Sequence, residues 1–194
     1  SDLIPESKYH NNFDFFGFPD FGKKYLKDKP LAPLAYKPLE KVSSVLAAVE
    51  EKDHFINVPY HSYESVVQFF EQASKDPDVT HIKIVQYRVA KNSRIMDALI
   101  EAAENGKNVF VFIEVKARFD EEANLKWGEK LEAAGIRVRY SFPGLKVHSK
   151  IALVRKVQNQ KAKLYTYLST GNFHEGTANL YSDFGLFTFD ERIT

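Results

Sequence analysis

The chain has 194 residues, of which 44% are hydrophobic and 27% charged, and its formal net charge is +1. This composition is typical of a globular protein, and the length allows one domain with an appended segment. The nearly balanced charge excludes a global attraction to nucleic acid or membranes, so any anion site must be a local cluster of Arg, Lys and His. The absence of cysteine excludes disulfides, thiolate zinc sites and cysteine nucleophiles, and it fits a cytoplasmic protein. The sequence contains no signal peptide and no apolar run long enough to cross a bilayer.

Residues 1–37 differ from the rest of the chain, because neither helical nor strand periodicity persists there. A short stretch of this segment carries the phenylalanines Phe13, Phe15, Phe16, Phe18 and Phe21. We predict a linker or extended arm. Five phenylalanines are too many for a free solvated tail, so we expect them to pack on the main domain or on a domain outside this chain.

Regular patterns begin at residue 38. Helices are predicted from Pro38, after Ser62, after Ser93 and over residues 120–134, with Gly106 and Gly135 ending the last two. Strands are predicted over residues 79–87, 109–115, 136–140, 146–155, 163–168 and 184–189. Strands that alternate with helices predict an α/β layered fold, in which helices flank a mixed, largely parallel sheet.

The strongest chemical signal is the run of residues 144–150, Gly-Leu-Lys-Val-His-Ser-Lys. On a strand, His148 and Lys150 would point to the same face, which places a nucleophile beside a fixed positive charge. Such a pair suits a phosphate group, because the lysine neutralises its charge while the imidazole reacts with it. The alternative interpretation is a strand with two exposed polar side chains.

A second signal, residues 169–172, follows the next predicted strand along the chain. Gly171 would let backbone amides approach an anion, and Asn172 could orient an imidazole or bind a phosphate oxygen. The alternative is an ordinary turn. Because adjacent strands place their ends close together, we expect this segment to lie near His148.

Arg88 and Arg118 each follow a strongly apolar predicted strand and precede a helix. Ligands of open α/β sheets bind outside the carboxyl ends of the strands, where an arginine offers a bidentate fork to phosphate. The alternative is a structural ion pair, for example between Arg118 and the acidic residues 120–122. Those carboxylates suit the first turn of a helix better than a metal site. Tyr181, in a predicted loop, could stack on a base, donate to phosphate or pack in the core.

Five of these runs occur in the same order in a known family. They are residues 87–90, 116–124, 144–150, 169–173 and 180–183. The sequence resembles the long, phosphohistidine-forming polyphosphate kinase of bacteria, and from about residue 40 to the end it looks like the first of the two C-terminal catalytic domains of that family. The phenylalanine-rich arm resembles the stretch that joins this domain to a preceding helical domain. The resemblance therefore implies an arm over residues 1–37 and a catalytic domain over residues 38–194.

This resemblance implies an ATP:polyphosphate phosphotransferase that moves the terminal phosphate of ATP to polyphosphate, reversibly, through a phosphohistidine. His148 corresponds to the histidine that is phosphorylated. Arg88 and Arg118 correspond to two arginines at the phosphate and magnesium site, and Tyr181 to a tyrosine that contacts the nucleotide. Because a guanidinium cannot be a metal ligand, we expect Mg²⁺ to be held through the phosphates, with no direct side-chain ligand.

Lys150 and Asn172 are expected to contact phosphate as well. They fit the fold that the resemblance implies, which is similar to phospholipase D, whose half-site is HxKxxxxD followed by a GSxN-like turn. Arg155 occupies the position of the aspartate in that motif, which weakens a phosphodiesterase interpretation. Two alternatives stay open: a phospholipase D-like hydrolase or nuclease half-site that dimerises, and a non-catalytic module that binds polyphosphate or nucleotide.

The resemblance also implies partners beyond this chain. The family carries N-terminal, helical and second C-terminal domains, and the second C-terminal domain supplies another histidine that no residue here matches. The chain ends at Ile193-Thr194 without a turn signal, so we expect a piece of a longer protein that is inactive alone. The whole enzyme is expected to be a cytoplasmic homo-oligomer that uses ATP and polyphosphate, with no nucleic acid partner and no transmembrane segment. Association of the full protein with a membrane stays open.

Overall fold

The computed structural model describes residues 15, 17–29, 31–115, 121–142, 144 and 146–194. The chain divides into two compact units, Ser1–Ala32 and Pro33–Thr194. The described part of the first unit contains a short 3-10 helix, η2 (Lys24–Leu26). Its phenylalanines contact one another, because the ring centroids of Phe15 and Phe18 lie 6.3 Å apart and those of Phe18 and Phe21 lie 5.8 Å apart. Two expectations for this segment remain predictions. One is the domain boundary after residue 37, and the other is the packing of the phenylalanines on the main domain or on a domain outside this chain.

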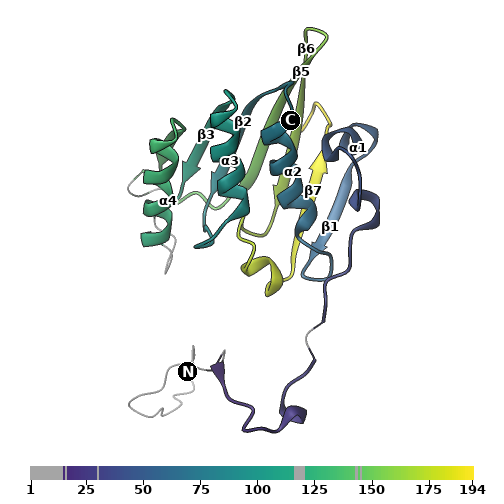
Figure 1. Cartoon of the computed structure of the whole chain (residues 1–194), viewed down its shortest axis with the longest axis vertical. Coiled ribbons are helices and arrows are strands. Elements are labelled where there is room, and N and C mark those ends of the chain that lie inside the picture. The colour runs from purple at the N-terminus through teal and green to yellow at the C-terminus, as the bar shows by residue number, and fades with distance from the viewer. Residues whose placement is uncertain (1–14, 16, 30, 116–120, 143, 145) are drawn as a thin grey trace. The chain divides into compact units, whose positions relative to one another are not determined.

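The second unit is built on a seven-stranded sheet (Figure 1). Its strands are β1 (His54–Val58), β2 (Val79–Gln86), β3 (Asn108–Ile113), β4 (Arg137–Tyr140), β5 (Lys150–Gln158), β6 (Lys161–Ser169) and β7 (Asp183–Thr188). They follow the order β1-β7-β6-β5-β2-β3-β4 across the sheet. Strands β2, β3 and β4 run parallel, and the remaining neighbours are antiparallel.

The predicted mixed α/β sheet is confirmed, but its parallel part is smaller than the sequence suggested. Helices connect β2 to β3 and β3 to β4, which is the connection that parallel strands require. By contrast, β5 and β6 form a tight hairpin, in which Asn159 and Gln160 have φ angles of 51° and 63°. Such a two-residue turn joins only antiparallel strands. The result is a sheet with a parallel half and an antiparallel half.

In the described part of this unit, four α-helices accompany the sheet. They are α1 (Val45–Glu51), α2 (Glu64–Lys75), α3 (Arg94–Glu104) and α4 (Glu121–Ala133), and the 3-10 helices η3 (Lys37–Leu39) and η4 (Thr177–Asn179) flank them. Ser93 begins α3 as predicted, because its side chain accepts a hydrogen bond from Met96 N at 3.3 Å. The glycines that follow α3 and α4, Gly106 and Gly135, have φ angles of 79° and 78°, which favour glycine at these positions. Among the described residues, no helix is long and apolar enough to cross a membrane.

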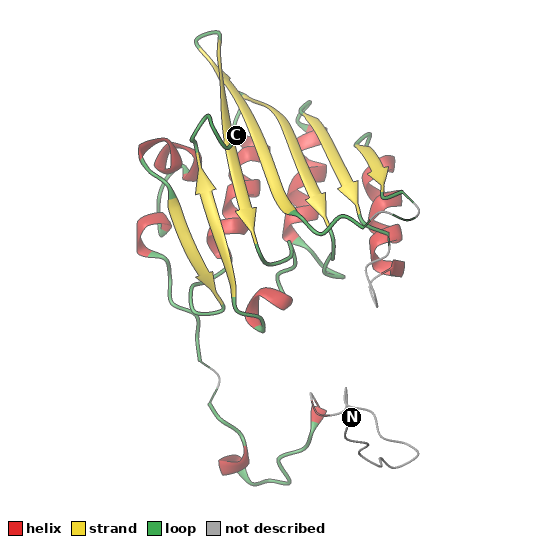
Figure 2. Ribbon diagram, turned by 180° about the vertical axis from the view of Figure 1, so that it is seen from behind, coloured by secondary structure: helices red, strands yellow, loops and turns green. Residues whose placement is uncertain are grey.

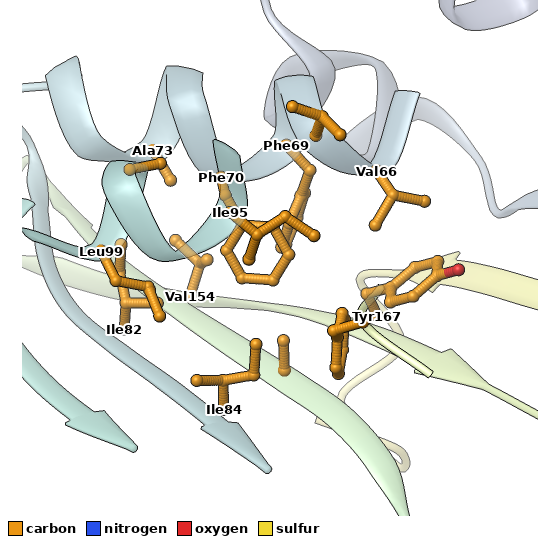
Figure 3. Close-up of a cluster of buried hydrophobic side chains, with 14 of the residues drawn as sticks. Val66, Phe69, Phe70, Ala73, Ile82, Ile84, Ile95, Leu99, Val154 and Tyr167 are labelled. Carbon is orange, nitrogen blue, oxygen red and sulfur yellow. The ribbon is translucent and has the colours of Figure 1, made fainter. Parts of the chain in front are cut away.

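The core lies between the sheet and these helices. Figures 1 and 2 show the helices gathered on one face of the sheet. Figure 3 shows α2 and α3 placing Phe70 and Ile95 against strand residues such as Ile84. All three side chains are fully buried. The alternation of buried and half-buried residues along the strands follows from the two-residue period of a strand, so one sheet face is apolar and packed.

The opposite sheet face is not covered by any helix of the described part of this unit (Figure 2). Phe55 of β1 and Phe184 of β7 stack on this face with ring centroids 5.3 Å apart, and they remain 55% and 46% exposed. Half-buried apolar residues such as Leu153, Leu168 and Leu186 continue the face across the sheet, because the strand register places them on the same side. The sheet is therefore packed on one side and uncovered on the other, where these apolar residues lie beside charged ones such as Lys83 and Arg155.

Candidate active site

The segments that carry His148, Lys150, Arg88 and Asn172 meet at one edge of the sheet. Strand β2 ends at Gln86 and is followed by Tyr87 and Arg88, while β5 begins at Lys150 beside the last residue of β6, Ser169. Strand β7 begins close to the same edge, because its Gly185 pairs with Ser169. In Figure 1 this edge is the lower end of the sheet, near η4. The topology therefore places the ends of several strands around one small region.

His148 lies in the loop that precedes β5, not on the strand that the sequence predicted over residues 146–155. The ladder between β5 and β6 begins with the pair Lys150 and Ser169, so the residues before Lys150 have no strand partner in it. The side chain of Lys150 is buried, and its Nζ donates a hydrogen bond to the backbone carbonyl of His148 at 2.6 Å. The two residues are held together as expected, but through the backbone of the histidine and not as neighbours on one strand face.

A ring and several cations surround His148. The rings of Tyr87 and His148 make an edge contact with centroids 4.9 Å apart and an interplanar angle of 75°. Around the Tyr87 ring lie Lys150 Nζ at 5.0 Å, Lys146 Nζ at 5.4 Å and Arg88 Cζ at 5.9 Å from its centroid. Lys146 was not singled out from the sequence, although it lies within the run 144–150. The exposed imidazole therefore lies in a strongly positive environment.

This environment favours the neutral imidazole. Partial burial lowers the pKa of His148 below its ordinary value of 6.5, and the positive charges of Lys150, Lys146 and Arg88 lower it further. Burial also lowers the pKa of Lys150; Asp183 opposes this shift, and Arg88 and Lys146 add to it. A neutral imidazole beside convergent cations can attack a phosphorus atom, while the cations stabilise the charge of the phosphate oxygens.

The second predicted signal borders the same edge. Gly171 packs so closely against Asp183 that an added Cβ would lie 2.7 Å from the Asp183 carboxylate, which explains why no side chain fits there. The buried Oδ1 of Asn172 has no hydrogen-bond partner in the described part of the chain. This free acceptor suits the orientation of an imidazole N–H, one of the two roles predicted for Asn172.

Three buried polar residues that were not predicted from the sequence connect the strand ends. Glu114 follows β3, and its carboxylate accepts hydrogen bonds from Ser141 Oγ and Val147 N, both at 2.8 Å. Asn124 of α4 donates to the carbonyls of Tyr87 and Glu114 at 2.9 and 3.0 Å. Gln86 donates to the carbonyl of Phe173 at 3.1 Å. The available signal was a lone carboxylate at the end of an apolar strand, which is costly to bury without partners.

The other residues named from the sequence are Tyr181, Arg155 and Arg118. Tyr181 lies in the turn between η4 and β7, and it is 56% exposed. Arg155 lies toward the far end of β5, where its Nη1 donates to Thr80 Oγ1 at 2.9 Å. Arg118 lies outside the described residues, so the structure does not place it. The residues brought together are thus His148, Lys150 and Arg88, with Asn172 in the adjacent loop.

The described residues do not form a direct metal site. No group of three or more His, Asp or Glu side chains in the part that the structure describes could hold a metal ion. The charged side chains around His148 are cations, which repel a divalent metal. These residues therefore do not fit a protein-held Mg²⁺, whereas they do fit phosphate oxygens.

Replacing Glu114 by Gln should loosen the loop that carries His148. An amide has one acceptor oxygen and cannot accept both hydrogen bonds in the same geometry, so a buried donor loses its partner, at a cost of about 1–3 kcal/mol. We expect urea denaturation to show this loss of stability, and hydrogen exchange to show faster exchange of the Val147 amide. Glu104→Gln, an exposed glutamate at the end of α3, should change neither. An unaltered Val147 amide in the Glu114 variant would contradict this role.

Comparisons with known proteins agree with the resemblance found in the sequence. Residues 44–194 match the family described as polyphosphate kinase C-terminal domain 1. The chain is 47% identical over 191 residues to the polyphosphate kinase of Vibrio vulnificus strain YJ016, covering 98% of this chain and 27% of that protein. It is 46% identical over 194 residues to the polyphosphate kinase of Escherichia coli strain K12, covering 99% of this chain and 28% of that protein. The chain thus spans about a quarter of the length of these relatives.

Solved structures support the same assignment. The crystal structure of polyphosphate kinase from Porphyromonas gingivalis matches with a TM-score of 0.79 and 43% identity, over 98% of this chain and 32% of that chain. A phospholipase D family member, Nuc from Salmonella typhimurium, matches with a TM-score of 0.55 and 18% identity, over 72% of this chain and 83% of that chain. The second match shows a shared fold only. The family match over most of the chain and the high identity to these kinases show that the chain belongs to the polyphosphate kinase family, in the part described as its C-terminal domain 1.

Proposed function

We propose that this chain is the phosphate-accepting part of a polyphosphate kinase, which transfers the terminal phosphate of ATP reversibly to polyphosphate through a phosphohistidine at His148. One observation carries the proposal: an exposed imidazole with a lowered pKa lies among three converging cations. That environment keeps the nucleophile neutral and at the same time attracts a phosphate group. Family membership makes ATP and polyphosphate the substrates that fit this chemistry.

The proposed reaction has two transfers. The unprotonated ring nitrogen of His148 attacks the γ-phosphorus of ATP in line, an N–P bond forms, and the P–O bond to ADP breaks as ADP leaves with the electron pair. The other ring nitrogen then loses its proton to a base. In the second transfer, a terminal oxygen of polyphosphate attacks the same phosphorus, the N–P bond breaks, and the ring takes up a proton again. The two transfers together move one phosphoryl group from ATP to polyphosphate and regenerate the free histidine.

Side chains near His148 have distinct roles in this proposal. Lys150, Lys146 and Arg88 neutralise the charge of the transferring group, and Arg118, which lies outside the described residues, adds a further guanidinium. Asn172 accepts a hydrogen bond from the imidazole or contacts a phosphate oxygen. Tyr181 contacts the nucleotide from its exposed position. Mg²⁺ enters as part of the nucleotide substrate, bound to its phosphates.

The rest of the activity is assigned to polypeptide outside this chain. Relatives are about four times as long, since the chain covers 27% of one of them. We propose that the remaining domains supply the second histidine as acid or base and part of the nucleotide pocket. The isolated chain is therefore expected to turn over slowly or not at all. We further propose that the whole protein is cytoplasmic, because ATP is its substrate, and that it is a homo-oligomer, as the family resemblance implies.

A phospholipase D-like hydrolase is the second candidate function. The shared fold and the paired His148 and Lys150 favour it. However, Arg155 replaces the carboxylate of that motif and binds Thr80 far along β5. The cluster of cations beside His148 also suits a highly charged phosphoanhydride better than a singly charged phosphodiester. We therefore favour the kinase.

Incubation of the longer protein with Mg-ATP should add one phosphoryl group at His148. Intact mass under alkaline quench is the measurement, because phosphohistidine is stable to alkali and labile to acid. The His148→Ala variant should show no adduct and should lose polyphosphate synthesis, because the nucleophile is absent. His174→Ala serves as the matched control, since this histidine lies after the Asn172 turn and has no part in the proposed transfer. An adduct that survives in His148→Ala, or nucleotide binding without any adduct in the wild type, would refute the mechanism.

The rate of phosphohistidine formation should depend on pH through the His148 imidazole. Because its pKa is lowered by burial and by three cations, the reactive neutral form persists below pH 6.5, and the rate should fall only at still lower pH. Lys146→Met removes one positive neighbour, which raises the imidazole pKa and moves the fall to higher pH. Lys161→Met, in the distant β5–β6 hairpin, should leave the profile unchanged. Quenched-flow measurements from pH 5 to 8 test this, and a fall centred above pH 6.5 in the wild type would contradict it.

A further inference from the structure

Tyr87 has an unusual position for a buried aromatic residue. It is only 6% exposed, yet it does not belong to the hydrophobic cluster that most other buried apolar side chains of the described chain form. Its ring instead contacts the imidazole of His148 and has three cationic groups within 6 Å of its centroid. Arg88 is its chain neighbour, so the two lysines, which come from a distant segment, are the informative contacts.

Three cations that converge on one point repel one another. The repulsion is evident at Lys150, whose pKa is lowered first by burial and further by Arg88 and Lys146. Asp183 offsets part of this charge from β7. The face of an aromatic ring carries negative partial charge and attracts ammonium and guanidinium groups, more strongly where water is excluded. The Tyr87 ring is therefore placed to hold these cations together before any phosphate arrives.

The ring is held rigidly enough for this role. The Tyr87 carbonyl accepts a hydrogen bond from the buried Asn124 of α4 at 2.9 Å, and its neighbour Gln86 is tied to Phe173. Glu114 fixes the amide of Val147, between Lys146 and His148. Asn124 and Gln86 thus anchor the strand end that carries the ring, and Glu114 anchors the loop that carries Lys146 and His148.

We propose that Tyr87 is a positioning residue, whose ring gathers Lys146, Lys150 and Arg88 into an oligophosphate-binding cluster and orients the His148 imidazole by its edge contact. The proposed role of Tyr87 in phosphate binding rests only on these contacts. Its proposed effect on phosphoryl transfer rests also on the function proposed above. With the ring absent, the cations separate, and they must converge again when phosphate binds. The ring thus reduces the reorganisation that accompanies binding.

The test is a series of ring substitutions at Tyr87 in the 194-residue chain, with tripolyphosphate binding measured by calorimetry. Tyr87→Phe keeps the ring and should bind like the wild type. Tyr87→Leu removes it and should bind about tenfold more weakly, the scale of a cation–π contact in a partly desolvated site. Phenylalanines with one, two and three ring fluorines are nearly isosteric with Phe but have a progressively weaker negative face. Affinity should fall stepwise along this series.

The fluorinated series keeps the test independent of folding, because packing hardly changes along it. Tyr60→Leu, an exposed tyrosine in the turn after β1, is the control and should bind like the wild type. Equal affinity across the fluorinated series, or wild-type affinity in Tyr87→Leu, would overturn the proposal. A large loss in Tyr87→Phe would overturn it as well, because the hydroxyl and not the ring would then be responsible.

The longer protein separates this inference from the proposed function. If wild type forms phosphohistidine, Tyr87→Leu should slow its formation by about tenfold at saturating ATP, while Tyr87→Phe restores the rate. A wild-type rate in Tyr87→Leu would overturn the orienting role and leave the kinase proposal intact. If wild type forms no phosphohistidine but tripolyphosphate binding still follows the fluorinated series, the kinase proposal fails and the binding role of Tyr87 stands.

Discussion

Repulsion among like charges is the constraint on which this site depends. Lys146, Lys150 and Arg88 lie close enough to lower the pKa of the imidazole that they surround. Such a cluster separates unless the backbone that carries it is fixed. Buried polar side chains hold this backbone in place. Asn124 bridges the residues that follow β2 and β3, and the carboxylate of Glu114 links the loop of His148 to Ser141 by hydrogen bonds. Rigidity in the buried layer therefore permits a high density of positive charge around His148.

The topology explains how residues from distant parts of the chain reach this point. The parallel strands β2 and β3 deliver Tyr87, Arg88 and Glu114 at their carboxyl ends. The neighbouring β5 runs in the opposite direction, so its first residue, Lys150, arrives at the same edge. A mixed sheet thus combines the ends of parallel strands with the beginning of an antiparallel one. A purely parallel sheet would have placed Lys150 at the far edge.

Much of this architecture was predictable because it depends on local patterns. The apolar strands, the Ser93 cap and the glycine helix ends follow from periodicity and backbone preference, and the run 144–150 indicates His148 as the candidate nucleophile. Strand β1 was missed, because its five residues include the buried His54 and the exposed Phe55, which invert the usual pattern. The alternation of residue types predicts a strand through the loop at His148, but the partner strand ends at Ser169, so the ladder stops at Lys150. Glu114 could not be assigned from sequence, because its partners lie 27 and 33 residues away.

The uncovered face of the sheet has a practical consequence for handling the protein. Phe55, Phe184 and the half-buried leucines form an apolar surface on the side opposite the helices. Surfaces of this kind associate with each other in water at a strength that grows with the area they remove from it. A solution of this chain by itself will thus tend to self-associate as concentration rises and to bind hydrophobic dyes. Replacing Phe55 and Phe184, the two most exposed rings of this surface, by polar residues is the direct way to obtain a well-behaved monomer.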